Sequence, residues 1–132
     1  MVRILIVDDS DSIRRQLRRV VERNPQWEVC GEARDGREAI DKALSGAPDI
    51  VLLDYRLPIL NGLQAAQEIS RLVPTAKILL CSMHCSPDLI AAARDAGIHG
   101  AVSKCDTRQI VRAIEALLRC QNFFTDSETA LV

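Results

Sequence analysis

Five residues of types that could handle a phosphoryl group each follow a short apolar segment: Asp8, Asp9, Asp54, Ser82 and Lys104. Clustered carboxylates repel one another unless a cation or a proton intervenes. Hard oxygen ligands with an open coordination position suit Mg²⁺, which binds phosphoryl oxygens readily. A lysine and a hydroxyl opposite the cation would neutralise and hydrogen-bond the remaining oxygens. If the fold brings these residues together, they predict a Mg²⁺-dependent phosphoryl site.

The sequence contains no cradle for a nucleotide. Neither GxxxxGK nor GxGxxG, the glycine-rich patterns that bind nucleotide phosphates, occurs in the chain. A phosphoryl group is therefore expected to be transferred to the protein itself, with Asp54 as the nucleophile. Taken singly, each of these polar residues could equally be a helix cap or a turn former. Their joint placement carries the prediction.

The elements that must position these residues alternate between strands and helices. Continuous apolar runs at 4–7, 50–53 and 78–81 predict strands buried on both faces, as in a parallel sheet covered by helices. Weaker strands are expected at 27–33 and 100–103. Between the strands, apolar residues recur with a period near 3.6, which predicts five helices. Right-handed crossovers then give an open, doubly wound α/β domain.

Four residues mark helix ends. Asp35, with a glutamate three residues later, is typical of a capping box, and Ser86 before a proline is typical of an N-cap. Gly46 and Gly97 fall where a helix C-terminus favours a left-handed residue. In such open sheets, ligands bind outside the carboxyl ends of the strands. The five chemically capable residues are all expected at that edge.

Composition limits the class of protein. The 132 residues are 48% hydrophobic and 27% charged, values that fit one soluble domain and exclude disorder. The net charge of −1 argues against a general nucleic-acid-binding or membrane-surface protein. No apolar run approaches the roughly 20 residues that span a bilayer, and no signal peptide is evident. We therefore expect a cytoplasmic protein that contacts neither membrane nor nucleic acid through this domain.

The five cysteines show no paired spacing and are interpreted as free thiols with the packing role of small apolar residues. Zinc held by Cys81, His84, Cys85 and Cys105 is the competing hypothesis. Zinc sites need four ligands in a fixed geometry, and no pair-of-pairs pattern supports one here.

At the chemically capable residues the sequence resembles the receiver domains of two-component response regulators. The resemblance covers residues 1 to about 120. Its motifs are ILIVDDS at 4–10, VLLDYRLPILNG at 51–62, LLCSMH at 79–84 and GAVSK at 100–104. It implies a flavodoxin-like fold with five parallel strands in the order 2-1-3-4-5 and helices on both faces.

The same resemblance implies roles for individual residues. Asp54 would accept a phosphoryl group from a sensor histidine kinase, and Lys104 and Ser82 would contact the phosphoryl oxygens. Mg²⁺ would be bound by Asp9, by Asp8 through water, by Asp54 and by the backbone carbonyl of Arg56. The chain would then be a signalling domain, and not an enzyme beyond its own phosphorylation and slow dephosphorylation.

Two positions depart from the family pattern. Ala101 stands where the family usually has a tyrosine or phenylalanine that rotates inward on activation. Cys105 stands where the family often has a proline after the lysine. An aromatic switch is therefore not expected, and activation would use movement of the backbone loops.

Two alternatives to a receiver remain open at this stage. Asp9-Ser10-Asp11 also resembles the DxD of haloacid-dehalogenase-type phosphatases, although no late acidic residue follows a strand-like run. The second alternative is an interaction module that has lost phosphorylation. The presence of Asp54, Ser82 and Lys104 gives no reason to prefer it.

The last residues suggest how the domain is used. Residues 121–132 lose the helical stripe and are expected to be a tail or the start of a linker to an output domain. Their sequence resembles the linker to helix-turn-helix domains, which implies transcription regulation. The arginine-rich first helix is interpreted as a solvated face, with kinase docking as the functional alternative. A homodimer through the last two helices is a further expectation.

Overall fold

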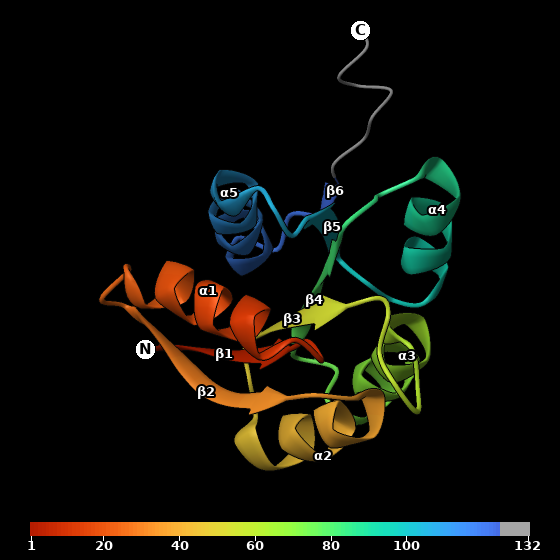
Figure 1. Ribbon diagram of the computed structural model, residues 1–132, viewed down its shortest axis with the longest axis horizontal. Coiled ribbons are helices and arrows are strands. Elements are labelled where there is room, and N and C mark those ends of the chain that lie inside the picture. The colour runs from red at the N-terminus through yellow and green to blue at the C-terminus, as the bar shows by residue number, and fades with distance from the viewer. Residues whose placement is uncertain (125–132) are drawn as a thin grey trace, which may run out of the picture.

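The computed structural model describes residues 1–124; residues 125–132 lie outside the described part of the chain. In the described part, strands and helices alternate along the chain (Figure 1). The strands are β1 (Val2–Val7), β2 (Trp27–Ala33), β3 (Ile50–Asp54), β4 (Lys77–Ser82), β5 (Gly100–Ser103) and β6 (Phe123–Phe124). The helices are α1 (Asp11–Glu22), α2 (Gly36–Gly46), α3 (Gly62–Leu72), α4 (Pro87–Asp95) and α5 (Thr107–Leu118).

The strands form one parallel sheet in the order β2-β1-β3-β4-β5-β6. The doubly wound fold and the order of the first five strands are therefore confirmed. The central strands are continuous apolar runs because both faces of the sheet are covered: every residue of β3 is buried.

The sheet separates two hydrophobic cores (Figure 1). On one face, α1 and α5 pack through Leu17, Val21 and Ile114. On the other face, α2, α3 and α4 cover the sheet, with Ile69 of α3 at 0% exposure. Helices on both faces leave the carboxyl ends of the strands as the place where polar side chains can gather.

The predicted helix caps are largely confirmed. Ser86 caps α4, and Asp35 accepts a hydrogen bond from the Glu38 N–H at the start of α2. The Glu38 side chain reaches back to the N–H of Arg34, one residue before the cap. Gly97 has φ +85°, as predicted for a residue that ends a helix.

The end of α2 differs from the prediction, which placed the left-handed backbone conformation at Gly46. The residue that adopts it is Ala47, with φ 45°. Gly46 remains the last residue of α2. Its carbonyl accepts two hydrogen bonds from the Arg3 side chain, at 3.1 Å from Nε and 2.8 Å from Nη2. This external donor satisfies the terminal carbonyl, so the helix runs one residue further than the glycine suggests.

The sixth strand is an addition to the five that the sequence predicts. Phe123 and Phe124 pair with Gly100 and Ala101, and the N–H of Phe123 donates to the carbonyl of His99 at 3.1 Å. A two-residue strand is too short for a periodic pattern, which is why the sequence does not reveal it. The expected boundary at residue 120 stays a prediction, and most of the expected tail lies outside the described residues.

Among the helices of the described residues, none is both long enough and apolar enough to cross a bilayer.

Candidate functional site

The predicted polar residues lie at the carboxyl ends of neighbouring strands. Asp8 directly follows β1, Asp54 ends β3, Ser82 ends β4, and Lys104 directly follows β5. The sheet order makes these four strands adjacent, so the topology brings the side chains to one edge. Asp8, Asp54 and Ser82 are 1%, 4% and 7% exposed, respectively. Charged groups this well buried require partners.

Three carboxylates gather at this edge. Each of Asp8, Asp9 and Asp54 offers an oxygen, and these oxygens all lie within 4.8 Å of one another. Asp9 is exposed, while the other two are buried. Hard oxygen donors that are partly open to solvent suit a divalent cation such as Mg²⁺, which keeps several waters. The donor set therefore fits the cation that the sequence predicts.

Lys104 contacts two of the three carboxylates. Its Nζ lies 3.1 Å from Oδ2 of Asp8 and 3.4 Å from Oδ2 of Asp54. The N–H of Lys104 also donates to the carbonyl of Ser82 at 3.0 Å, which fixes the start of the loop after β5. Burial alone would lower the pKa of Lys104, but the charges of Asp54 and Asp8 raise it above its ordinary value. The ammonium is thus held charged between two carboxylates.

Asp54 has the opposite balance. Burial, with the nearby charge of Asp8, raises the pKa of Asp54 above its ordinary value, although Lys104 acts in the other direction. The protein therefore disfavours the charge on Asp54. A cation placed beside this carboxylate would relieve that penalty.

A groove of about 750 Å³ opens beside Asp54 and runs toward α4. Ser82, Arg56, His84 and Lys104 line it. The hydroxyl of Ser82 donates to the carbonyl of His84 at 3.1 Å, so it is directed to the loop that follows β4. Asp54 is itself among the residues that line this groove.

Comparison with known proteins identifies the family. The model of the family described as "Response regulator receiver domain" matches residues 4–115. The chain belongs to this family of receiver domains. This receiver domain is 38% identical to the chemotaxis protein CheY of Thermotoga maritima over 115 residues, which are 87% of this chain and 93% of that protein.

Other relatives contain a receiver domain as one part. A protein-glutamate methylesterase/protein-glutamine glutaminase of Carboxydothermus hydrogenoformans is 44% identical over 82 residues, which are 62% of this chain and 23% of that protein. This receiver domain thus spans about a quarter of the length of such methylesterases. The solved structure of a LuxR-family response regulator from an Aurantimonas species superimposes with a TM-score of 0.89 at 36% identity. That alignment covers 93% of this chain and 89% of the other.

The two residues that depart from the family pattern, Ala101 and Cys105, differ in their exposure in this receiver domain. Ala101 is 0% exposed and pairs with Phe124 of β6, whose side chain packs against the same core. Cys105 is exposed, with its Sγ 3.7 Å from Sδ of Met83.

Within residues 1–124, the cysteines and histidines form no cluster of three that could bind a metal. Burial raises the pKa of the Cys81 and Cys85 thiols, so both favour the unreactive protonated form.

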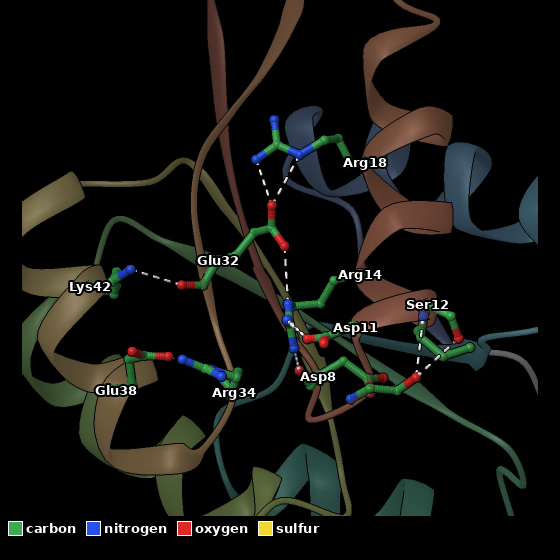
Figure 2. A network of polar contacts seen from close by, with 11 residues as sticks. Asp8, Asp11, Ser12, Arg14, Arg18, Glu32, Arg34, Glu38 and Lys42 are labelled. Atoms are coloured by element: carbon green, nitrogen blue, oxygen red, sulfur yellow. Dashed lines mark hydrogen bonds and ion pairs between the residues drawn. The ribbon is translucent and has the colours of Figure 1, made fainter.

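Sequence reasoning missed Arg14, which the arginine-rich first helix seemed to place in solvent. Arg14 is 9% exposed, and its Nη1 donates to the carbonyl of Asp8 at 2.7 Å (Figure 2). A signal was present in the spacing. Arg14 precedes Leu17 by three residues and Val21 by seven, so it belongs to the apolar stripe that faces the sheet.

Proposed function

We propose that this receiver domain is a phosphorylation-dependent switch that accepts a phosphoryl group on Asp54 from a sensor histidine kinase, with Mg²⁺. The contact of Lys104 with both Asp8 and Asp54 carries this proposal. One ammonium joins two buried carboxylates from separate strands, beside an exposed third. Such a set of charges binds a phosphoryl group and a divalent cation together.

Asp54 is the nucleophile in this proposal. One of its oxygens attacks phosphorus while the P–N bond of a phosphohistidine breaks. An acyl phosphate then stands on Asp54, and the released imidazole takes up a proton. Burial and the charge of Asp8 raise the pKa of Asp54, which means that the charged carboxylate is destabilised. Formation of the acyl phosphate removes the charge from the carboxylate itself.

The cation site comprises Asp8, Asp9, Asp54 and the backbone carbonyl of Arg56. Mg²⁺ bound there would neutralise charge that develops on the phosphoryl oxygens. Asp8 uses Oδ1 to accept from the N–H of Ser10 at 2.9 Å and Oδ2 to contact Lys104. Because both oxygens already have partners, a bond from Asp8 to the cation through water fits better than direct ligation.

Lys104 and Ser82 would respond to the new group. Phosphorylation adds a charge of about −1.5 to −2 at pH 7. Lys104 would pair with the phosphoryl oxygens, and the Ser82 hydroxyl would leave the His84 carbonyl to donate to one of them. That rotation would release the loop after β4, and no aromatic side chain at Ala101 is needed for it.

The output in this proposal is transcription regulation in the cytoplasm. The likeness to a LuxR-family response regulator supports it, as does the linker-like sequence that begins at residue 121. The domain would catalyse only its own phosphotransfer and slow dephosphorylation. A homodimer through α4 and α5 belongs to the same proposal.

The test is to incubate the chain with Mg²⁺ and acetyl phosphate and to measure intact mass. We expect one phosphoryl group per chain, lost in Asp54→Asn and on removal of Mg²⁺ by a chelator. Asp49→Asn is the matched control, because Asp49 is exposed just before the start of the same strand and should keep the label. Absence of an adduct, or an adduct that survives in Asp54→Asn, would overturn the proposal. Sustained release of phosphate without an adduct would instead favour a phosphatase.

A further inference from the structure

Arg14 is the one buried arginine among the described residues, and it contacts the backbone of Asp8 at the acidic edge of the site. Its guanidinium extends from α1 toward β1 and β2 (Figure 2). Arg15 and Arg19 of the same helix are exposed. Burying a guanidinium is unfavourable unless its donors are satisfied. The partners of Arg14 therefore indicate what its burial achieves.

Each of the three nitrogens of Arg14 has a partner. Nη1 donates to the backbone carbonyl of Asp8 at 2.7 Å, and Nε donates to Oε1 of Glu32 at 3.0 Å. Nη2 contacts the carboxylate of Asp11. Arg14 thus joins three segments: the end of β1, the strand β2 and the first turn of α1.

Glu32 is itself held from a second side. Arg18 donates to Oε2 of Glu32 from both Nε and Nη2, at 3.0 and 2.6 Å. Burial would raise the pKa of Glu32, but the hydrogen bonds from Arg18 and Arg14 lower it below its ordinary value. Glu32 therefore stays charged and provides a fixed support for the Arg14 guanidinium.

The bond to Asp8 orients the loop that carries the cation ligands. The N–H of Asp8 donates to the carbonyl of Ala33 at 3.1 Å, and its carbonyl accepts from Arg14. That carbonyl and the N–H of Asp9 belong to one planar peptide unit. Holding that carbonyl therefore fixes the plane of the peptide that links Asp8 to the exposed Asp9.

We propose that Arg14, supported by Glu32, is a positioning residue that holds the Asp8–Asp9 peptide in the orientation required to bind the cation. The inference rests on the proposed function, since it concerns the same Mg²⁺ site. A ligand loop ordered before binding loses less entropy when the cation arrives. Residues that orient metal ligands commonly change metal affinity by about 10- to 100-fold when they are replaced.

Loss of the Arg14 charge and loss of its positioning role would change the Mg²⁺ affinity in opposite directions. A guanidinium near a divalent cation repels it, so loss of charge alone would tighten Mg²⁺ binding. Loss of positioning would weaken it. The direction of change in Mg²⁺ affinity therefore distinguishes the two effects.

The experiment is calorimetric titration of the chain with Mg²⁺ alone. We expect Arg14→Gln to raise the Kd for Mg²⁺ about 10-fold, in the lower part of the range for such residues. Arg15→Gln is the matched control: it loses the same charge from the next position of the same helix, but Arg15 is exposed, so its Kd should stay close to the wild-type value. An Arg14→Gln domain that is folded and binds Mg²⁺ as tightly as the wild type, or more tightly, would overturn the inference.

A second readout separates positioning from chemistry. With acetyl phosphate in excess, the Mg²⁺ concentration for half-maximal labelling should rise in Arg14→Gln, while the rate at saturating Mg²⁺ stays close to the wild-type rate. If Arg14→Gln does not fold, Arg14→Lys decides, because it keeps the positive charge but cannot make the three guanidinium contacts at once: weaker Mg²⁺ binding supports the inference and unchanged binding overturns it. Wild-type protein that binds Mg²⁺ but acquires no phosphoryl group would count against the proposed function and leave the role of Arg14 standing.

Discussion

Asp54 carries a charge that its surroundings oppose. It is 4% exposed, and burial and Asp8 raise its pKa while Lys104 offsets part of the effect. A carboxyl whose pKa is raised on folding destabilises the fold at pH values where it is ionised. Asp54 is thus ionised at a cost in stability that a bound cation would relieve.

Replacement of Asp54 should therefore stabilise the domain in the absence of metal. In a chelator, Asp54→Asn removes the disfavoured charge, while Lys104 retains Asp8 as a partner, so the free energy of unfolding should rise. Urea denaturation followed by the fluorescence of Trp27, the single tryptophan, measures it. Adding Mg²⁺ should stabilise the wild type more than the variant. A variant that is less stable than the wild type in chelator would contradict this account.

His99 provides a pH dependence away from the site. Its Nδ1 accepts from the N–H of Ile78 at 3.0 Å, and burial, with the charge of Lys77, lowers its pKa below the ordinary 6.5. A lowered pKa means that the unfolded chain binds the proton more readily, so stability is present above pH 6.5 and is lost as pH falls through that value. Wild-type protein should therefore lose stability between about pH 7.5 and 5.5.

His99→Gln should reduce this pH dependence, measured as the difference in unfolding free energy between the two pH values. His84→Gln is the matched control, since it replaces the other histidine of the chain and leaves His99 in place. Equal slopes for wild type and His99→Gln would show that the proton is taken up elsewhere.

The gathering of the polar site residues at one edge could be predicted because each lies at the end of a recognisable strand, and parallel strands bring their carboxyl ends together. Arg14 could not be assigned in the same way. It lies in an arginine-rich segment, and such segments usually form a solvated face. The ion pair between Arg14 and Glu32 is evident only once α1 packs beside β2. Partners that are 18 residues apart in sequence, on different elements, leave no local pattern.

At the scale of elements, the loop between β3 and α3 combines order with strain. Asn61 and Gln64 form a capping box at the start of α3, which fixes one end of the loop. Two residues earlier, Ile59 has φ 72° and is 72% exposed. A β-branched residue in this left-handed conformation is strained, at about 1–2 kcal/mol for an ordinary L-residue.

Ile59→Gly should therefore stabilise the domain by about 1 kcal/mol, since relief of strain exceeds the entropy that glycine adds to the unfolded chain. The expected rise in Tm is about 3–6 °C for a domain of this size. Ile59→Ala is the control, because it removes the same exposed side chain but keeps a Cβ in the left-handed conformation. If both variants change Tm equally, strain at Ile59 is not the cause.

The elements themselves were largely predictable, and their ends were less so. Buried strands such as β3 read as continuous apolar runs because helices cover both faces. The end of α2 could not be placed, because the donor that extends it is Arg3, from another element. The strand β6 could not be predicted from the sequence for a related reason. Its two residues form a strand only because they pair with β5, which is another element.

At the scale of the whole molecule, the sheet depends on a close approach at Gly100. A Cβ built on Gly100 would lie 2.5 Å from the carbonyl oxygen of Phe123, a backbone atom of the neighbouring strand. The pairing of β5 with β6 therefore requires glycine at this position. Phe124 continues the pairing, with the guanidinium of Arg94 from α4 at 4.0 Å from its ring centre.

Gly100→Ala should destabilise the domain by about 1–3 kcal/mol, the usual range for overpacking. Gly31→Ala is the matched control, a strand glycine where a Cβ would meet Leu5 at an ordinary 3.5 Å; its effect should stay within about 0.5 kcal/mol. Urea denaturation measures both. Similar losses for the two variants would indicate that strand glycines, and not the approach of Phe123, set the cost.

The short strand β6 also bears on self-association. Without it, the outer edge of β5 would present unpaired N–H and C=O groups, which are templates for strands of other chains. Phe123 and Phe124 cover the first two residues of that edge. A chain that ended at residue 120, where the sequence suggests the domain stops, would leave this edge open beside an exposed apolar core. Such a chain should aggregate more readily than one that retains the two phenylalanines.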